Sequence, residues 1–212
     1  MYLAVVAFAT LTIAVNIRNL YDSFGTALRY SFFQVNAFTS TTGFSTADFD
    51  LWPQYSKTLL TLLMFMGACA GSTAGGMKVS RIMILFRAAK VELKHMLHPR
   101  SFNPVTIERK SVSKETLRST LVYFSMEILV LGIGTLLISF ENFDFTTSFT
   151  SVATCMANVG PGFNLVGPTH NFSIFSPWTK IMLSVYMLIG RLELYPMMIL
   201  FYPSTWKKKG QF

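Results

Sequence analysis

The stretch SFFQVNAFTSTTGFST, residues 31–46, decides how this sequence is organised. Its first half is apolar enough for a helix but too short to cross a bilayer, which takes about 20 residues. Its second half is rich in hydroxyl groups, and a lipid-facing segment does not tolerate a polar loop because the loop's backbone would lack hydrogen-bond partners. The stretch therefore predicts a short helix that enters a membrane, followed by a loop buried in protein or facing water.

The composition of the whole chain agrees with a membrane protein. Hydrophobic residues make up 51% of the 212 residues, and charged residues only 13%, about half the usual ~25%. A soluble protein of this size would have too little polar surface to stay dissolved. Two cysteines and a high apolar content also exclude a disulfide scaffold and a disordered chain.

Apolar runs around this stretch predict four membrane spans and a second short helix with a polar loop. The expected spans are residues 1–17, a segment from residue 55 to about 66, residues 121–140 and residues 178–202. The second short helix is expected at residues 145–157 and its loop at residues 158–164.

The net charge of +8 is a topology signal. Ten of the 18 basic residues lie between Lys78 and Arg118, and three more are Lys207, Lys208 and Lys209. Basic clusters beside apolar segments mark the cytoplasmic side and contact anionic lipids, so membrane lipid is the expected partner of this charge and nucleic acid is not.

The order of elements repeats, which predicts an all-α membrane protein of two parallel repeats, each with a span, a short pore helix, a loop and a span. A shift of 117 residues places Ser31 on Ser148 and Gly43 on Gly160. The first repeat is residues 1–98, with a glycine-rich break in its second span at residues 67–78. A basic cytoplasmic linker, residues 99–118, leads to the second repeat, residues 119–206, and a basic cytoplasmic tail, residues 207–212.

The two loops have the composition of an ion filter. Rings of backbone carbonyls replace the hydration shell of potassium in the filter sequence TVGYG of potassium channels. The segments TTGFS, residues 41–45, and NVGPG, residues 158–162, are degenerate versions of it. The alternatives are a re-entrant loop with only a packing role, or a selectivity unrelated to potassium.

The break in the second span also predicts a function. Four glycines lie in the ten residues 67–76, and glycine weakens a helix. A helix weakened there would present small residues and hydroxyls to a cavity and bend at low cost. The alternative is close helix packing through small residues. Residues 79–97 then predict a cytoplasmic or interfacial amphipathic helix.

At residues 41–44, 67–78, 158–163 and 190–193 the sequence resembles the Trk/Ktr/HKT potassium transporters, in particular the bacterial Trk/Ktr membrane subunits. The resemblance implies four repeats around one potassium-channel-like pore, of which this chain is similar to the third and fourth. It implies filter carbonyls from Thr41, Thr42, Gly43, Asn158, Val159 and Gly160. It also implies a gate loop that includes Gly67, Gly71, Ser72, Thr73, Gly75 and Gly76.

Arg191 is the remaining candidate for a functional residue. A cation at membrane depth costs at least ~2.5 kcal/mol, so it should face protein or water. The resemblance implies that it lies below the filter as an electrostatic barrier to ions. The alternative is an internal ion pair with Glu193 or Glu127.

The expected function is potassium uptake across the bacterial plasma (inner) membrane through a gated, filter-containing pore. The alternatives are a sodium- or proton-coupled symporter and a non-conducting half-pore or regulatory subunit. No enzyme motif is present, so no catalytic residue is expected, nor any bound cofactor or metal beyond the transported potassium.

Two repeats supply only two of four filter strands. We therefore expect missing N-terminal repeats, a separately encoded half or a second copy to complete the pore, and the short first span favours a truncated longer protein. The resemblance further implies a homodimer that carries a cytosolic ring of nucleotide-binding regulatory subunits.

Overall fold

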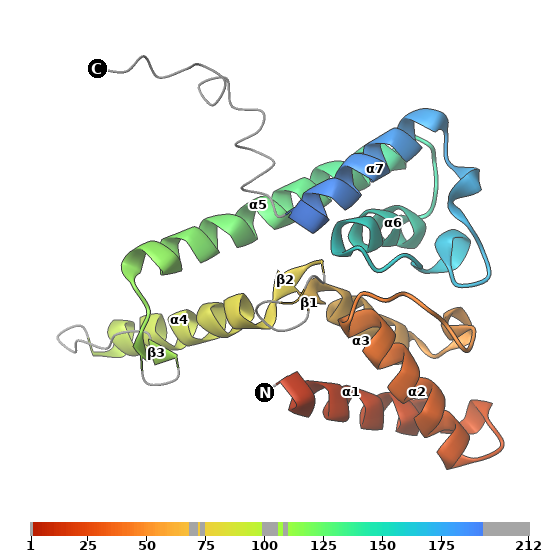
Figure 1. Cartoon of the computed structure of the whole chain (residues 1–212), viewed down its shortest axis with the longest axis horizontal. Coiled ribbons are helices and arrows are strands. Elements are labelled where there is room, and N and C mark those ends of the chain that lie inside the picture. Colours follow the sequence, from red (N-terminus) through yellow and green to blue (C-terminus); the bar gives the residue numbers. More distant parts are fainter. Residues whose placement is uncertain (1, 68–71, 73–74, 99–105, 108–109, 193–212) are drawn as a thin grey trace.

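The computed structural model describes residues 2–67, 72, 75–98, 106–107 and 110–192. The described chain is mostly helical and has two units of similar order, joined by a connector that extends to one side (Figure 1). The first unit contains α1 (Tyr2–Asn16), η1 (Arg18–Leu20), α2 (Phe24–Thr39), η2 (Phe49–Leu51) and α3 (Gln54–Phe65). The second unit contains α5 (Lys114–Ser139), α6 (Phe145–Ala157), η3 (Asn164–Val166), η4 (Phe172–Ile174) and α7 (Pro177–Leu192).

The connector contains two very short β ladders, which the all-α prediction did not include. β1 (Met66–Gly67) pairs in parallel with β2 (Met77–Lys78). The amphipathic helix expected at residues 79–97 is α4 (Val79–Leu97). β3 (Thr106–Ile107) and β4 (Lys110–Ser111) form an antiparallel pair before α5.

Helix α5 is the described helix that is long and apolar enough to cross a membrane, and the other three predicted spans are shorter in the part of the chain that the structure describes. Its 26 residues extend about 39 Å at 1.5 Å per residue, enough for a hydrocarbon core of about 30 Å. Apolar side chains such as Leu129, Ile133 and Leu136 are exposed along it, as lipid-facing residues would be.

Helix α5 begins earlier than the sequence predicted. It starts at Lys114, within the stretch expected to be linker, because Ser113 caps it: the Thr116 N–H donates to Ser113 Oγ over 3.1 Å. Glu115 lies in the first turn, where its negative charge favours the helix N-terminus. Local capping thus extends the helix into the basic segment.

In α1 the inward face consists of small and branched residues at helical spacing. Val6, Ala9, Thr10, Ile13 and Ala14 are buried, and the helix packs mainly on α2. Large apolar side chains on its other face are exposed. A helix that is apolar on both faces is typical of a membrane or a large core.

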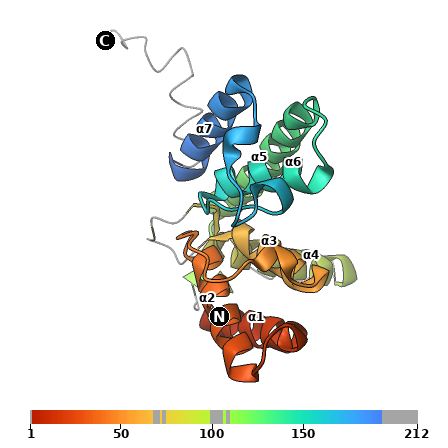
Figure 2. The same cartoon turned by 90° about the vertical axis from the view of Figure 1, so that its right-hand side faces the viewer.

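The two units lie one above the other (Figure 2) and share a hydrophobic core. Phe163 of the second unit is 2% exposed within the core of the first. Its ring centre lies 5.4 Å from that of Phe49 and 6.4 Å from that of Phe38. The second unit is therefore anchored in the first just beyond the predicted filter residues.

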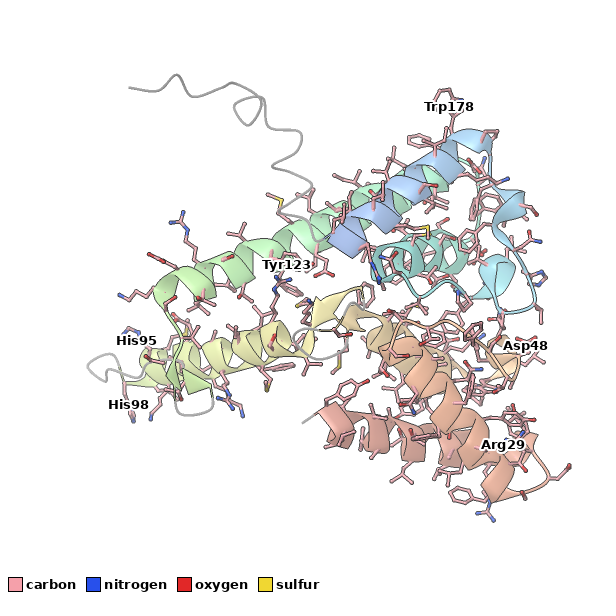
Figure 3. The ribbon with its side chains drawn as sticks, in the orientation of Figure 1. Arg29, Asp48, His95, His98, Tyr123 and Trp178 are labelled. Atoms are coloured by element: carbon pink, nitrogen blue, oxygen red, sulfur yellow. The ribbon has the colours of Figure 1, made fainter. Side chains whose placement is uncertain are left out.

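The charged ends of the molecule lie apart. Figure 3 places Asp48 at one end, near the first unit's loops, and His95 and His98 at the far tip of α4. Asp48 and the tip of α4 therefore lie at opposite ends of the molecule.

Candidate functional site

The short helices α2 and α6 each end in one of the predicted filter loops. We call residues 40–46 the first loop and residues 158–164 the second loop. Ser23 caps α2 by accepting from the Thr26 N–H, and Asp144 caps α6 by accepting from the Thr147 N–H. At the other end, the chain leaves each helix through a residue with positive φ: Thr41 at 55° and Asn158 at 56°.

The two loops fold back on their helices with the same backbone hydrogen bonds, 117 residues apart. The Thr42 N–H donates to the Ala37 carbonyl over 3.0 Å, and the Val159 N–H donates to the matching Thr154 carbonyl over 3.0 Å. One residue earlier, the Thr41 N–H donates to the Phe38 carbonyl and the Asn158 N–H to the matching Cys155 carbonyl. The predicted repeat thus has matched local geometry at these residues.

In both loops a second residue with positive φ follows two positions after the first. After Thr41 and Asn158 it is found at Gly43, at 72°, and at Gly160, at 114°. Alternation between left- and right-handed residues turns successive peptide groups toward one side of the chain. Only glycine adopts such φ values without steric cost, which explains Gly43 and Gly160. The backbone carbonyls of these loops are the groups that the sequence predicts as cation ligands.

Hydroxyl groups of α6 hold the second loop in place. Thr154 Oγ1 accepts from the Gly160 N–H over 2.9 Å and donates to the Pro161 carbonyl over 3.1 Å. Thr150 Oγ1, one turn earlier, accepts from the Phe163 N–H over 3.2 Å. The matching residues of α2 are Phe33 and Ala37, which have no hydroxyl, so this support belongs to the second loop.

The two loops touch. A Cβ atom added at Gly43 would stand 1.8 Å from the carbonyl oxygen of Val159, whereas a Cβ at the matching Gly160 would meet nothing within 4 Å. Gly160 is exposed, and a mostly apolar cavity of about 500 Å³ opens beside it between α6 and α7. One side of the loop pair is therefore closed and the other is open.

The helix is interrupted at the predicted gate segment, whose Gly75 lies beside the end of α6. Helix α3 ends at Phe65, and α4 starts at Val79. The parallel pairing of β1 with β2 lets the chain resume in its original direction. Gly75 lies against the end of α6, since a Cβ there would stand 2.3 Å from the Ala157 carbonyl oxygen.

Further close contacts fix the start of this segment. A Cβ at Gly67 would stand 2.4 Å from the Gly75 carbonyl oxygen, and Gly76 has a φ of 72°. Ser72 is half-buried. Gly71 and Thr73, also predicted gate residues, lie outside the described residues.

Arg191 lies in the last turn of α7, and its side chain is exposed. Gly190 before it abuts the end of α6: a Cβ there would stand 1.8 Å from the Met156 carbonyl oxygen. Arg191 is therefore held close to the helix that carries the second loop. Of its two proposed partners, Glu193 lies outside the described residues.

Glu127, the other proposed partner, lies on α5 and is 4% exposed. It lines a cavity of about 10 Å³ with Gly76, Met156 and Gly190. The positive charge of Arg81, on α4, acts on the Glu127 carboxylate. The guanidinium carbon of Arg81 lies 4.2 Å from the centre of the Tyr123 ring. Tyr123 projects from α5 toward α4 (Figure 3).

Sequence reasoning missed the residues that support the second loop. Thr150 and Thr154 are four residues apart, which places both hydroxyls on one helix face, and this spacing was a readable signal. The role of Asn164 could not be predicted from local spacing, because Asp50, which accepts from its backbone N–H, is 114 positions away.

Comparisons with known proteins agree on one family. The family model TrkH, described as a cation transport protein, matches residues 3–208. The Trk system potassium uptake protein TrkH of Salmonella typhimurium is 36% identical over 93% of this chain and 40% of its own length. TrkG of Escherichia coli is 34% identical over 89% of this chain and 38% of its own length.

A solved structure agrees with these relatives. The crystal structure of the potassium transporter TrkH from Vibrio parahaemolyticus superposes with a TM-score of 0.88 at 31% identity, over 97% of this chain and 44% of that chain. The chain thus spans about 40% of the length of the relatives that it matches.

Proposed function

Because this chain belongs to the TrkH family of cation transport proteins, we propose that its two loops are two of the four strands of a potassium filter. One observation carries the proposal: Thr41 and Gly43 match Asn158 and Gly160 in backbone hydrogen bonding and in positive φ. Carbonyls of Thr41, Thr42, Gly43, Asn158, Val159 and Gly160 take the place of the ion's hydration shell. The Salmonella typhimurium and Escherichia coli relatives are potassium uptake proteins.

The pore is completed by further strands. Gly43 packs against Val159, but the matching Gly160 has no neighbour within 4 Å of a Cβ position. A ring of four similar strands would give Gly160 a neighbour as well. N-terminal repeats or a second copy of the chain supply the remaining strands, against the open side of α6 and α7.

Ion flow is controlled below the filter. The gate is the segment that contains Gly67, Ser72, Gly75 and Gly76, and the close approach of Gly75 to the Ala157 carbonyl at the end of α6 supports this assignment. Arg191 adds a positive charge that repels cations entering the same region.

The assembly is a multi-pass protein of the bacterial plasma membrane. The resemblance supports a homodimer that binds a cytosolic ring of nucleotide-binding regulatory subunits. The basic helix α4 offers this ring a surface, since Lys90, Lys94 and His95 are exposed on it.

Growth of a potassium-uptake-deficient bacterium tests the proposal. The chain is expressed alone and joined to the N-terminal half of the Salmonella typhimurium relative. Rescue on micromolar to millimolar potassium by the joined form is expected, and rescue by the chain alone would show that copies of it complete the pore. If both forms are inserted in the membrane and neither takes up potassium, the result would favour a non-conducting subunit.

The symporter is the second candidate, and electrical recordings separate it from a pore. For a pore, the current reverses at the potassium Nernst potential and does not shift when sodium concentration or pH changes. A shift with either ion would indicate coupling.

A further inference from the structure

We propose that Asp50, Asn164 and Asp144 form a clamp that fixes the outer end of the second loop, and that this clamp sets how well the filter distinguishes potassium from sodium. The inference rests on the proposed function, since it treats the second loop as a filter strand. These three residues are positioning residues: they hold the strand and do not contact the ion.

Asn164, the last residue of the second loop, bonds to both halves of the chain. Its backbone N–H donates to Asp50 Oδ2 over 3.1 Å. Its side-chain Nδ2 donates to Asp144 Oδ2 over 2.9 Å. Both bonds have a carboxylate acceptor, and such bonds are stronger than neutral ones.

Asp50 is itself held in place from the first unit. Its Oδ1 lies 3.6 Å from Lys57 Nζ, and both side chains are 22% exposed. Lys57 Nζ also donates to the Asp50 carbonyl over 3.0 Å. The carboxylate that receives the second loop is therefore fixed to the start of α3.

Asp144 binds both the start of α6 and the end of the second loop. The same Oδ2 that receives Asn164 also accepts from the Thr147 N–H over 3.0 Å and so caps α6. Burial alone would raise the pKa of Asp144, but hydrogen bonds from Thr147 and Asn164 outweigh it and lower the pKa. One ionised carboxylate thus joins the start of α6 to the end of the loop that follows α6.

The backbone at Asn164 explains why an asparagine suits this position. Its φ is 55°, in the left-handed region that asparagine tolerates better than most residues. The loop is also anchored just before this residue by the buried ring of Phe163. The bonds of Asn164 and the buried ring of Phe163 therefore hold together the outer end of the segment that leads back to Gly160.

Within the described residues, the first loop has no equivalent clamp. The residue that matches Asn164 is Ala47, whose carbonyl accepts a long bond of 3.5 Å from Gln34 Nε2. The clamp is therefore specific to the second loop, and it makes the two strands unequal in rigidity.

The test uses whichever form conducts in the growth experiment, with variants matched for membrane level. Asp50→Ala removes the acceptor for the Asn164 N–H. Asp50→Asn retains an oxygen acceptor and is the conservative rescue. Asn164→Gly permits the same φ and keeps the N–H but loses the bond to Asp144. Asn142→Gly is the control, since Asn142 is an exposed asparagine with a φ of 59° that takes no part in the described clamp.

The measured quantity is the potassium-to-sodium permeability ratio, with the half-saturating potassium concentration beside it. Loss of a hydrogen bond to a charged group predicts a fall in the ratio of about tenfold for Asp50→Ala. The expected fall is about threefold for Asn164→Gly, and twofold or less for Asp50→Asn and Asn142→Gly. If Asp50→Ala does not reach the membrane, the permeability ratio of Asn164→Gly tests the clamp.

A wild-type ratio in inserted Asp50→Ala and Asn164→Gly, with potassium flux intact, would overturn the clamp and leave the proposed function standing. A merely structural role would lower the amount of protein or the maximal rate and leave the ratio unchanged. Absence of potassium flux in the wild type would instead be the failure of the proposed function.

Discussion

Single hydroxyl groups decide how firmly the second loop is held. Thr154 Oγ1 is bonded to both Gly160 and Pro161, and its side chain is buried. Buried polar groups that lose their partners are costly, so the effect of this one residue should extend to the whole strand.

Replacing Thr154 with valine should weaken both the fold and potassium binding. The valine keeps the volume but leaves the Gly160 N–H and the Pro161 carbonyl without this partner, at a cost of about 1–3 kcal/mol. Thermal unfolding in detergent and the half-saturating potassium concentration measure the two effects. Thr154→Ser, which retains the hydroxyl, should stay close to wild type, and equal losses for serine and valine would contradict the role given to the hydroxyl.

Replacing Arg191 with alanine should increase cation flux, because the substitution removes a positive charge from the proposed ion path. Radioactive rubidium uptake at equal membrane levels measures the change. Arg87→Ala, on the exposed side of α4, is the charge-matched control and should leave the maximal rate unchanged. Unaltered transport in a correctly inserted Arg191→Ala protein would count against a position in the pore.

At the scale of elements, a carboxylate joins the end of α5 to the start of α7. Glu141 accepts from the Ser176 hydroxyl over 2.6 Å and also from the Thr179 hydroxyl. These side-chain bonds, first that of Ser176 and then that of Thr179, hold the pKa of Glu141 below its ordinary value of 4.5. The second unit is thus closed at its outer end by one acid.

This bond should make stability depend on pH. Because the pKa is lowered in the folded protein, the stabilisation is fully present above about pH 4.5 and is lost as pH falls further. The melting temperature of wild type should exceed that of Glu141→Gln at pH 7, and the difference should shrink below pH 4.5. Glu92→Gln, on exposed α4, controls for loss of charge, and a difference that is constant down to pH 3 would exclude this mechanism.

Some helix boundaries can be predicted from the sequence and others cannot. The break between α3 and α4 follows from local composition, since the glycines of residues 67–76 lower helix propensity wherever they are placed. The first residues of α5 were missed because Lys114, Glu115 and Arg118 resemble a polar linker, although lysine and glutamate are good helix formers. The bonds of Asn164 depend on how the chain folds back onto Asp50, which residue type alone does not encode, whereas the four-residue spacing of Thr150 and Thr154 is visible in the sequence.

At the scale of the whole molecule, three phenylalanines join the two units. Phe38, Phe49 and Phe163 are each at most 2% exposed, and Phe163 alone comes from the second unit. The rings of Phe38 and Phe49 meet edge to face, with centres 5.2 Å apart. The rigidity of the proposed filter therefore depends on contacts between units as well as within them.

Truncating Phe163 to alanine should destabilise the whole described fold and not only the second loop. Removal of a buried phenylalanine costs about 3–5 kcal/mol, including the cavity that it leaves. Hydrogen exchange in detergent should show faster exchange in α2 as well as in α6. Phe140→Ala is the control, because Phe140 is 82% exposed, and faster exchange confined to the second unit would contradict a shared core.

The positive φ of Thr41 has a consequence for the stability of the first loop. A β-branched residue at a φ of 55° carries strain of about 1–3 kcal/mol, whereas Asn158 adopts the matching conformation more easily. In the proposed filter, a bound ion would offset that strain. In the proposed filter, the strand that contains Thr41 is therefore the one that would leave this conformation first when no ion is bound.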